Sequence, residues 1–245
     1  ENTKAVMIEM ELLPDDSIVN CLPFYHIGGK SLTDNFFARG CANVIMKKFD
    51  AEALAGIIQK EKTTTVVLVP SMIAMLLENP SIANYDLSSL RTIYYSASPM
   101  PEPLLEESIR RFGNVFFQSY GMTETGPSIA QLHKEDHLHV GELRGRIRSC
   151  GLPVDGVEVR VCMDGDIEVP PNATGEVTVR SRALMQGYLN QPEATEEVVS
   201  DGWLKTGDLG RVDEDGYLYI VGRKKDMVIS GGENVFAREV EAVVE

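Results

Sequence analysis

A carboxylate and a guanidinium flank a predicted hairpin near the end of the sequence. Asp208 precedes and Arg223 follows a turn at 213–216, where Asp-Gly accepts the left-handed backbone that tight hairpins need. Tyr217 to Val221 alternates and is aromatic and β-branched, which is typical of a strand. The hairpin therefore brings Asp208 near Arg223. The carboxylate accepts hydrogen bonds from both hydroxyls of a sugar diol, and the fork-shaped cation adds a donor. A structural ion pair beside a turn is the alternative.

A second polar cluster runs from Gln118 to Gly126, after a predicted strand. Tyr120 offers a flat face for stacking a base, and Gly121 permits close backbone approach. The Thr123 hydroxyl can reach a phosphate oxygen. Glu124 can hold Mg²⁺, a hard ion that accepts one or two carboxylates together with phosphate oxygens. The alternative is a polar loop with incidental Thr and Glu, because a motif this short needs structural context.

Two further segments lie where predicted strands end. Ser96 to Pro99 has small residues that leave room for a ligand, and its alternative interpretation is a tight strand–helix loop. Leu22 to Gly29 contains His26, and a lone histidine is more often structural than catalytic. Three other histidines, at positions 133, 137 and 139, suggest a metal site. Their polar context lacks a strong ligand pair, so the sequence does not favour zinc.

The elements that position these residues alternate between strand and helix from residue 16 to 118. Thr63 to Val69 is β-branched throughout, which suits a strand buried on both faces. The helix at 71–78 has Ser71 as a candidate N-cap. The other predicted strands are 17–22, 43–46, 90–96 and 115–118, and the other predicted helices are 51–60 and 101–112. This order implies right-handed crossovers, an α/β fold with a mostly parallel doubly wound sheet, and ligands at the carboxyl ends of its strands.

The pattern changes near Cys150. Short alternating strands at 156–162, 175–180 and 217–221, punctuated by Asp-Gly pairs, predict an antiparallel β subdomain. An amphipathic helix is expected to start at Val235. We therefore expect residues 1–149 to belong to a parallel α/β subdomain and 150–223 to a β-rich subdomain of one large domain. Residues 224–245 are expected to form the hinge and start of a small C-terminal α+β domain.

Composition excludes several classes of protein. The net charge of −14 argues against a nucleic-acid surface. No run approaches the ~18 apolar residues of a transmembrane segment. The four cysteines have no CxxC spacing, which favours reduced, mostly buried thiols in a cytoplasmic protein. The oligomeric state stays open, and a homo-oligomer is compatible with the sequence.

Two motifs carry a family resemblance. Lys-Thr-Gly-Asp-Leu followed by Gly-Tyr-Leu-Tyr-Ile-Val-Gly-Arg-Lys-Lys-Asp-Met-Val-Ile-Ser-Gly-Gly-Glu-Asn, spanning 205–234, resembles the adenylate-forming (ANL) enzymes, in particular the acyl-CoA synthetases. Tyr-Gly-Met-Thr-Glu at 120–124 is similar to the core nucleotide motif of the same family, in the right order. The family often has Gly where Ser96 and Ala97 stand, and Asp at the hinge where this chain has Lys225.

The resemblance implies a role for each matching position. Thr123 and Glu124 would be catalytic, with Glu124 also holding the metal. Lys225 would be the hinge between two domains. The expected acyl pocket is His26, Ile27 and Gly28, and the expected coenzyme A channel is Ser230, Gly231, Gly232 and Glu233. The expected ATP/AMP site comprises Ser96, Ala97, Ser98, Pro99, Gln118, Ser119, Tyr120, Gly121, Met122, Thr123, Asp208, Ile220 and Arg223.

The family's reaction uses ATP, Mg²⁺ and coenzyme A to activate a carboxylic acid, and a fatty or related hydrophobic acid is the expected substrate. The family's phosphate loop and its C-terminal catalytic lysine have no match in this sequence. We therefore expect an internal segment of such an enzyme, inactive by itself. A carrier-protein-loading adenylation domain and a non-catalytic nucleotide-binding remnant are the alternatives. The sequence does not give the chain length of the acid.

Overall fold

The computed structural model describes residues 2–138, 141–163, 165–230 and 233–235. The chain divides into two compact units. The first comprises residues 1–120 and 132–147, and the second comprises 121–131 and 148–245. The expected helix from Val235 lies outside the described residues, apart from its first residue.

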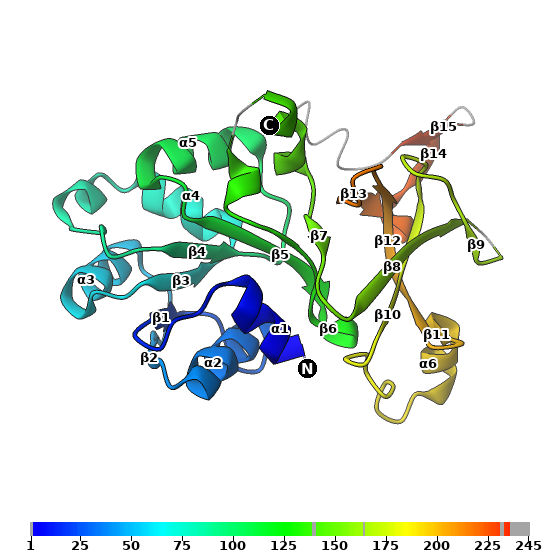
Figure 1. The fold of residues 1–245 in the computed structure, drawn as a ribbon, viewed down its shortest axis with the longest axis horizontal. Helices are drawn as coiled ribbons and strands as arrows, with labels where there is room; N and C mark the ends of the chain where they lie inside the picture. The colour runs from blue at the N-terminus through cyan, green and yellow to red at the C-terminus, as the bar shows by residue number, and fades with distance from the viewer. Residues whose placement is uncertain (1, 139–140, 164, 231–232, 236–245) are drawn as a thin grey trace. The chain divides into compact units, whose positions relative to one another are not determined.

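The first unit is built on parallel strands in the order β2-β1-β3-β4-β5, as Figure 1 shows. Short β-branched and aromatic runs form these strands, as the sequence predicts. Their bounds are β1 Ser17–Asn20, β2 Ala42–Ile45, β3 Thr65–Leu68, β4 Thr92–Tyr95 and β5 Phe116–Met122, the last of which ends in the second unit. Successive strands are joined by helices, so the predicted mostly parallel α/β sheet is confirmed.

Helices cover both faces of this sheet. One core packs α3, α4 and α5 on residues such as Val66, Ile93 and Phe116, and the other packs α1 and α2 on their neighbours Val67 and Phe117. Alternate strand residues thus face opposite layers, which explains why β3 and β4 are buried throughout. The bounds are α1 Asn2–Glu9, α2 Ile27–Arg39, α3 Ala51–Glu61, α4 Pro70–Glu78 and α5 Glu102–Phe112, with short 3₁₀ turns η1 Pro80–Asn84, η3 Glu135–His137 and η4 Gly141–Arg148.

The start of α4 and the end of β5 differ from the sequence-based expectation, and α2 was not expected. Ser71 is not the N-cap of α4, because the helix begins at Pro70 with Val69 in the cap position, and proline suits the first helical turn. The predicted strand at 115–118 continues to Met122, so part of the predicted polar loop is extended strand.

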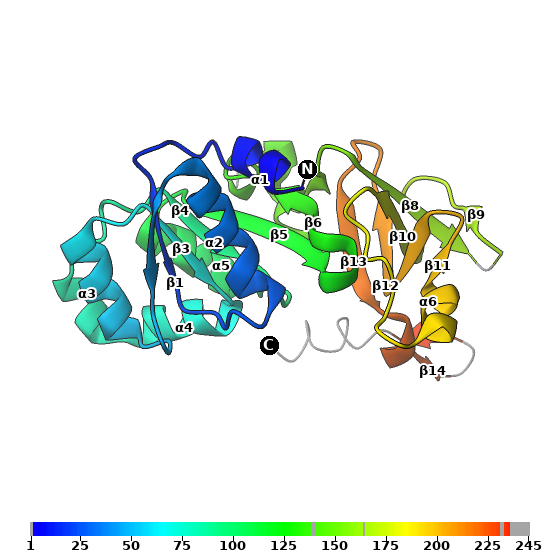
Figure 2. The same ribbon diagram turned by 90° about the horizontal axis from the view of Figure 1, so that it is seen from below.

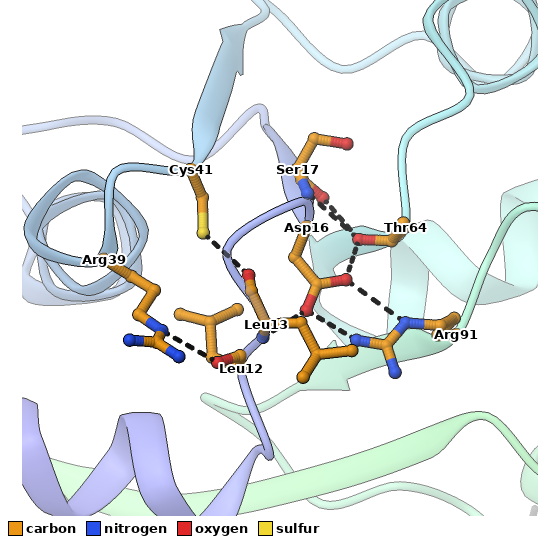
Figure 3. Close-up of polar contacts among 8 residues, drawn as sticks. All are labelled: Leu12, Leu13, Asp16, Ser17, Arg39, Cys41, Thr64 and Arg91. Atoms are coloured by element: carbon orange, nitrogen blue, oxygen red, sulfur yellow. Dashed lines mark hydrogen bonds and ion pairs between the residues drawn. The ribbon is translucent and has the colours of Figure 1, made fainter.

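A buried carboxylate ties together the amino ends of three parallel strands (Figure 3). Asp16 is 3% exposed and precedes β1. Arg91, just before β4, donates to it from Nη2 at 2.5 Å and from Nε at 3.2 Å. Thr64, just before β3, donates its hydroxyl at 2.7 Å, and the Leu13 amide donates at 2.8 Å. Every donor comes from a segment that enters or precedes a strand, so the carboxylate fixes these starting points relative to one another.

The ionisation of Asp16 follows from these contacts. Burial disfavours the charged form, but hydrogen bonds from Arg91, Thr64 and Leu13 outweigh it and hold the pKa of Asp16 below its ordinary value of 3.8. The carboxylate is therefore ionised at neutral pH.

A histidine also belongs to the core of the first unit. His137 is fully buried and packs against the rings of Tyr95 and Phe116. Its Nδ1 lies 2.7 Å from the His133 carbonyl and its Nε2 lies 2.9 Å from the Tyr95 hydroxyl. Burial lowers the pKa of His137 to about 4, so the ring is neutral at pH 7 and Nδ1 donates to the carbonyl. His139 lies outside the described residues.

The second unit holds an antiparallel sheet in the order β11-β12-β10-β8-β9, with β13 paired to β12 (Figure 2). Its strands are β8 Val157–Met163, β9 Ile167–Glu168, β10 Gly175–Ser181, β11 Val199–Ser200, β12 Trp203–Val212 and β13 Leu218–Arg223. The predicted antiparallel β subdomain is thus confirmed. The other elements are η2 Thr123–Thr125, β6 Gly126–Leu132, β7 Leu152–Pro153, α6 Pro192–Val198, η5 Lys224–Asp226, β14 Val228–Ser230 and β15 Glu233–Val235.

The two faces of this antiparallel sheet differ in chemistry. Val177 and Val179 on β10 are fully buried, whereas the alternating Arg180 is exposed. On the polar face, the Trp203 ring lies 4.0 Å from the Arg160 guanidinium carbon and 4.7 Å from that of Arg180. Such cation–π contacts fix the strand ends without a second apolar core.

All four cysteines are free and buried, as their spacing predicts. Among the described residues, no helix combines the length and the hydropathy needed to cross a bilayer.

We predict that Asp16→Asn lowers the free energy of unfolding at pH 7 by about 2 kcal/mol, because charged hydrogen bonds to Arg91 and Thr64 are weakened. Denaturant unfolding measures this loss. Because the folded-state pKa of Asp16 is below the unfolded value, its stabilisation is present above pH 3.8 and is lost as the pH falls toward the folded-state pKa. The difference between the proteins should therefore shrink below pH 3.8.

The matched control is Asp86→Asn, which breaks an exposed ion pair with Lys62 at 2.8 Å. Its effect should be much smaller, because solvent screens exposed pairs. Equal losses in the two variants would contradict the role assigned to Asp16.

Candidate functional site

The loop after β4 is exposed and has an unusual backbone. Ala97, Ser98 and Pro99 are exposed and Ser96 is half-buried. Ala97 has φ of 78°, a left-handed conformation that disfavours a side chain with a Cβ. Strain of this kind costs on the order of 1 kcal/mol and is concentrated at functional sites. The structure thus explains why glycine would suit this position, and it presents the backbone of the loop to solvent.

The end of β5 lies beside this loop. Tyr95 and Gln118 are register partners on β4 and β5, and the Tyr95 hydroxyl lies 3.2 Å from Gln118 Oε1. Ser119 is buried, and Gln118 and Tyr120 are half-buried. Ser96 to Pro99 and Gln118 to Tyr120, which the sequence treats as separate segments, therefore extend from adjacent strands at the same edge of the sheet.

Glu124 and Thr123 are displayed on a short 3₁₀ turn whose geometry is fixed by a residue that the sequence analysis does not single out. Thr125 is 1% exposed, and its hydroxyl accepts the Met122 amide at 3.3 Å and lies 3.1 Å from the Met122 carbonyl. Gly121 has no room for a Cβ, which would lie 2.4 Å from the Pro127 carbonyl oxygen. The close approach that Gly121 permits is therefore made by the chain's own backbone.

A cavity of about 450 Å³ in the second unit has Glu124 in its wall. Glu124 Oε1 accepts a hydrogen bond from the Tyr188 hydroxyl at 3.0 Å. Two ion pairs join lysines and carboxylates of the lining, Lys224 with Glu176 at 3.0 Å and Lys205 with Asp166 at 3.3 Å. Tyr188, Glu176 and Lys205 are missed by the sequence analysis, because residues far apart in the chain meet here only through the folding of the sheet.

The hairpin has the predicted geometry. Asp208 and Arg223 are register partners on β12 and β13, and Arg223 Nε lies 3.5 Å from Asp208 Oδ1. The Asp208 side chain is 13% exposed and that of Arg223 is 61% exposed. Ile220 lies on the same strand as Arg223, but its aliphatic side chain has no hydrogen-bonding group, so it can contribute only by packing.

Thr206 fixes the bulge of β12 that carries Asp208. It is 8% exposed, and its hydroxyl donates to the Val177 carbonyl at 2.8 Å while accepting the Asp208 amide at 3.1 Å. Between them Gly207 has φ of 74°, which the absence of a Cβ permits. The backbone of Asp208 is thus attached to β10 through one hydroxyl.

The loop after β1 lies at a reversal in strand order. β2 is on one side of β1 and β3 on the other, and ligands of open α/β sheets bind at the carboxyl ends beside such a reversal. Asn20, fully buried at the end of β1, donates to the Gly29 carbonyl at 2.5 Å and accepts the Leu22 amide at 2.8 Å. His26 caps α2 by accepting the Gly28 amide on Nδ1 at 3.1 Å. That ring nitrogen therefore has a structural role.

The remaining candidates lie near the end of the described chain. Lys225 is exposed on η5. Ser230 and Glu233 are register partners at the ends of β14 and β15. Gly231 and Gly232 lie outside the described residues.

The sequence matches the family model described as AMP-binding enzyme over residues 2–189. The chain belongs to this family. A medium/long-chain-fatty-acid–CoA ligase of Mycobacterium tuberculosis is 40% identical over 99% of the chain, which covers 41% of that relative. An indoleacetate–CoA ligase of Aromatoleum aromaticum is 39% identical over 94% of this chain, and the match covers 44% of that relative. The AMP-binding chain thus spans less than half the length of these curated relatives.

Solved structures show the same fold. An amide bond synthetase from Marinactinospora thermotolerans superposes with a TM-score of 0.91 at 34% identity, covering 99% of this chain and 48% of that one. The O-succinylbenzoate coenzyme A synthetase of Bacillus subtilis, in complex with ATP and magnesium ion, superposes with a TM-score of 0.89 at 34% identity. The match covers 99% of this chain and 49% of that one. These similarities confirm that this AMP-binding chain has the α/β fold of the family.

We predict that Thr206→Val, which keeps the side-chain volume but removes both hydrogen bonds, lowers the free energy of unfolding by about 1–2 kcal/mol. The Asp208 amide should exchange with solvent faster, because its acceptor is lost. Hydrogen-exchange measurements and denaturant unfolding test both effects. Thr206→Ser keeps the hydroxyl and should retain slow exchange. A valine variant with parental stability and exchange would show that the hydroxyl does not anchor this part of β12.

Proposed function

We propose that the chain carries the nucleotide site of an AMP-forming acid–thiol ligase that joins a hydrophobic carboxylic acid, such as a fatty acid, to coenzyme A. The observation that carries this proposal is the pairing of Asp208 with Arg223 across β12 and β13. It is supported by membership of the AMP-binding family and by relatives that are CoA ligases for different acids.

The Asp208–Arg223 pair suits a ribose. A carboxylate accepts hydrogen bonds from two vicinal hydroxyls, and the guanidinium beside it adds a donor. Two strands and the Thr206 hydroxyl hold Asp208, so little conformational entropy is lost when a ligand binds. In this proposal Tyr120 stacks on adenine, the exposed backbone of Ser96 to Pro99 lines the base, and Thr123 contacts the phosphates.

Glu124 fits a magnesium ion held jointly with substrate phosphates. It lines the cavity, and among the described residues its Oε2 accepts no hydrogen bond. Within the same part of the chain, no group of three His, Cys, Asp or Glu side chains is placed to hold a metal ion. One carboxylate together with phosphate oxygens is the donor set that Mg²⁺ commonly uses. When bound, the ion would neutralise phosphate charge.

The proposed reaction has two steps. A carboxylate oxygen of the acid attacks the α-phosphorus of ATP, forming acyl-AMP and releasing pyrophosphate. The coenzyme A thiol then loses its proton and attacks the acyl carbon, and AMP leaves. The chain contributes mainly by positioning these groups and by neutralising charge.

The loop after β1 is the proposed wall of the acyl pocket. It lies beside the reversal in strand order, and Phe24 and Tyr25 are 45% and 95% exposed in it. We assign the pocket to His26, Ile27 and Gly28, with His26 as a wall because Nδ1 caps α2. Lys225 is the proposed hinge for the second step, and the segment from Ser230 to Glu233 is the proposed coenzyme A channel.

A second acceptor is compatible with the same first step. The similarity to an amide bond synthetase at a TM-score of 0.91 supports an amine as the alternative group that attacks the acyl-adenylate. Loading of a carrier protein is a further alternative for the thiol. Comparing coenzyme A, simple amines and a carrier protein as acceptors distinguishes them.

We predict that a non-hydrolysable acyl-adenylate analogue stabilises the 245-residue chain. At about 100 times its dissociation constant it should add about 2.7 kcal/mol. For a chain of this size, that corresponds to a shift in melting temperature of roughly 5–10 °C. Thermal unfolding of the parent and of Asp208→Ala, with and without the analogue, measures it.

The shift should disappear in Asp208→Ala while the unliganded variant still unfolds cooperatively. Asp155→Ala, which removes an exposed carboxylate elsewhere in the second unit, should keep the parental shift. An equal shift in Asp208→Ala would refute the ribose role, and no shift in the parent would refute nucleotide binding by this chain.

A further inference from the structure

The segment before α6 holds Glu124 at two points. The Met185 amide donates to the Glu124 carbonyl at 2.8 Å, and the Tyr188 hydroxyl donates to Glu124 Oε1 at 3.0 Å. Tyr188 is 64 positions from Glu124 in sequence and 36% exposed. Both the backbone and the carboxylate of Glu124 are thus attached to a segment outside its own turn.

The helix α6 in turn fixes Tyr188. The Tyr188 amide donates to Thr195 Oγ1 at 2.9 Å, and that hydroxyl donates to the Gln191 carbonyl at 2.9 Å. Gly187 has φ of 149°, and a Cβ there would lie 3.1 Å from Thr195 side-chain atoms. The backbone of Tyr188 is therefore packed closely against the first turn of the helix, which limits where its hydroxyl can reach.

The hydroxyl of Tyr188 is the donor in its contact with Glu124. A tyrosine hydroxyl can donate, whereas a carboxylate oxygen only accepts, so the contact at 3.0 Å is a charge-assisted hydrogen bond. Glu124 Oε1 is engaged by this donor, while Oε2 accepts no hydrogen bond within the described part of the chain.

We propose that Tyr188 is the positioning residue for Glu124, orienting its carboxylate so that Oε2 faces a divalent cation bound to nucleotide phosphates. This inference rests on the function proposed above. The cavity's composition supports it, because two other lining carboxylates, Glu176 and Asp166, are paired with lysines, and the third, Glu197 on α6, is exposed to solvent. A metal site that depends on one protein carboxylate requires that carboxylate to be fixed before the ion arrives.

The test is Tyr188→Phe in the 245-residue chain, with calorimetric titration of ATP in excess Mg²⁺ and of AMP without metal. The variant should bind Mg²⁺–ATP about 5–10 times more weakly, as expected for loss of one charge-assisted hydrogen bond. AMP affinity should stay within about twofold of the parent, because AMP needs no cation. This difference separates a positioning role from a loss of structure.

Tyr85→Phe is the matched control. The Tyr85 hydroxyl donates to Glu52 Oε1 at 3.0 Å, which is a contact of the same kind in the first unit. Removing this hydroxyl should change neither the Mg²⁺–ATP affinity nor the AMP affinity. Equal Mg²⁺–ATP affinity in parent and Tyr188→Phe would overturn the positioning role, as would a parallel loss of AMP affinity. If the parent protein binds neither Mg²⁺–ATP nor AMP, the proposed function and this inference are both overturned.

Discussion

The buried Asp16 carboxylate is the interaction on which the arrangement of the first unit depends. It receives hydrogen bonds from Arg91, Thr64 and Leu13, all at the amino ends of strands. Strands fixed at one end and built of four or more residues must finish near the same edge. The loop after β1, the loop after β4 and residues 118–120 of β5 are therefore gathered at the opposite edge. Structural charge is buried at one edge, and candidate functional residues are exposed at the other.

The second unit positions its polar groups differently. Its candidate site residues are held by pairing across antiparallel strands and by single threonine hydroxyls that bond to two backbone groups at once. Thr206 links Asp208 to β10, Thr125 shapes the turn that presents Glu124, and Thr195 fixes the backbone of Tyr188. Each threonine satisfies a donor and an acceptor at once, so these turns need no further polar partner. The backbone segments that carry Asp208, Glu124 and Tyr188 are thus held by neutral hydroxyls, whereas the Asp208 carboxylate has Arg223 as its charged partner.

Periodicity and turn chemistry are sufficient to predict the parallel strands, the helices α3, α4 and α5, and the antiparallel subdomain. The hairpin at 213–216 was predicted because Asp-Gly and an alternating run specify both turn and register, so Asp208 and Arg223 could be paired from sequence. Helix α2 could not be predicted from the sequence. Gly28 and Gly29 weaken its first turn, and its start depends on the cap that His26 provides.

Contacts between residues far apart in the chain also could not be predicted from the sequence. The Tyr188 hydroxyl reaches Glu124 only because the loop before α6 packs against the turn of Glu124. No local sequence pattern predicts a contact between residues 64 positions apart. The need for glycine at 121 has a similar origin, since it reflects the nearby Pro127 carbonyl. The motif at 120–124 therefore singles out a candidate segment, while the residues that hold this segment in place become visible only in the structure.

A crystal structure of the 245-residue chain with a non-hydrolysable acyl-adenylate analogue would test the account most directly. The account predicts both ribose hydroxyls within hydrogen-bond distance of the Asp208 carboxylate and the adenine ring stacked on Tyr120. A ribose bound elsewhere, with Asp208 paired only to Arg223, would contradict it and assign that pair to the stability of the hairpin.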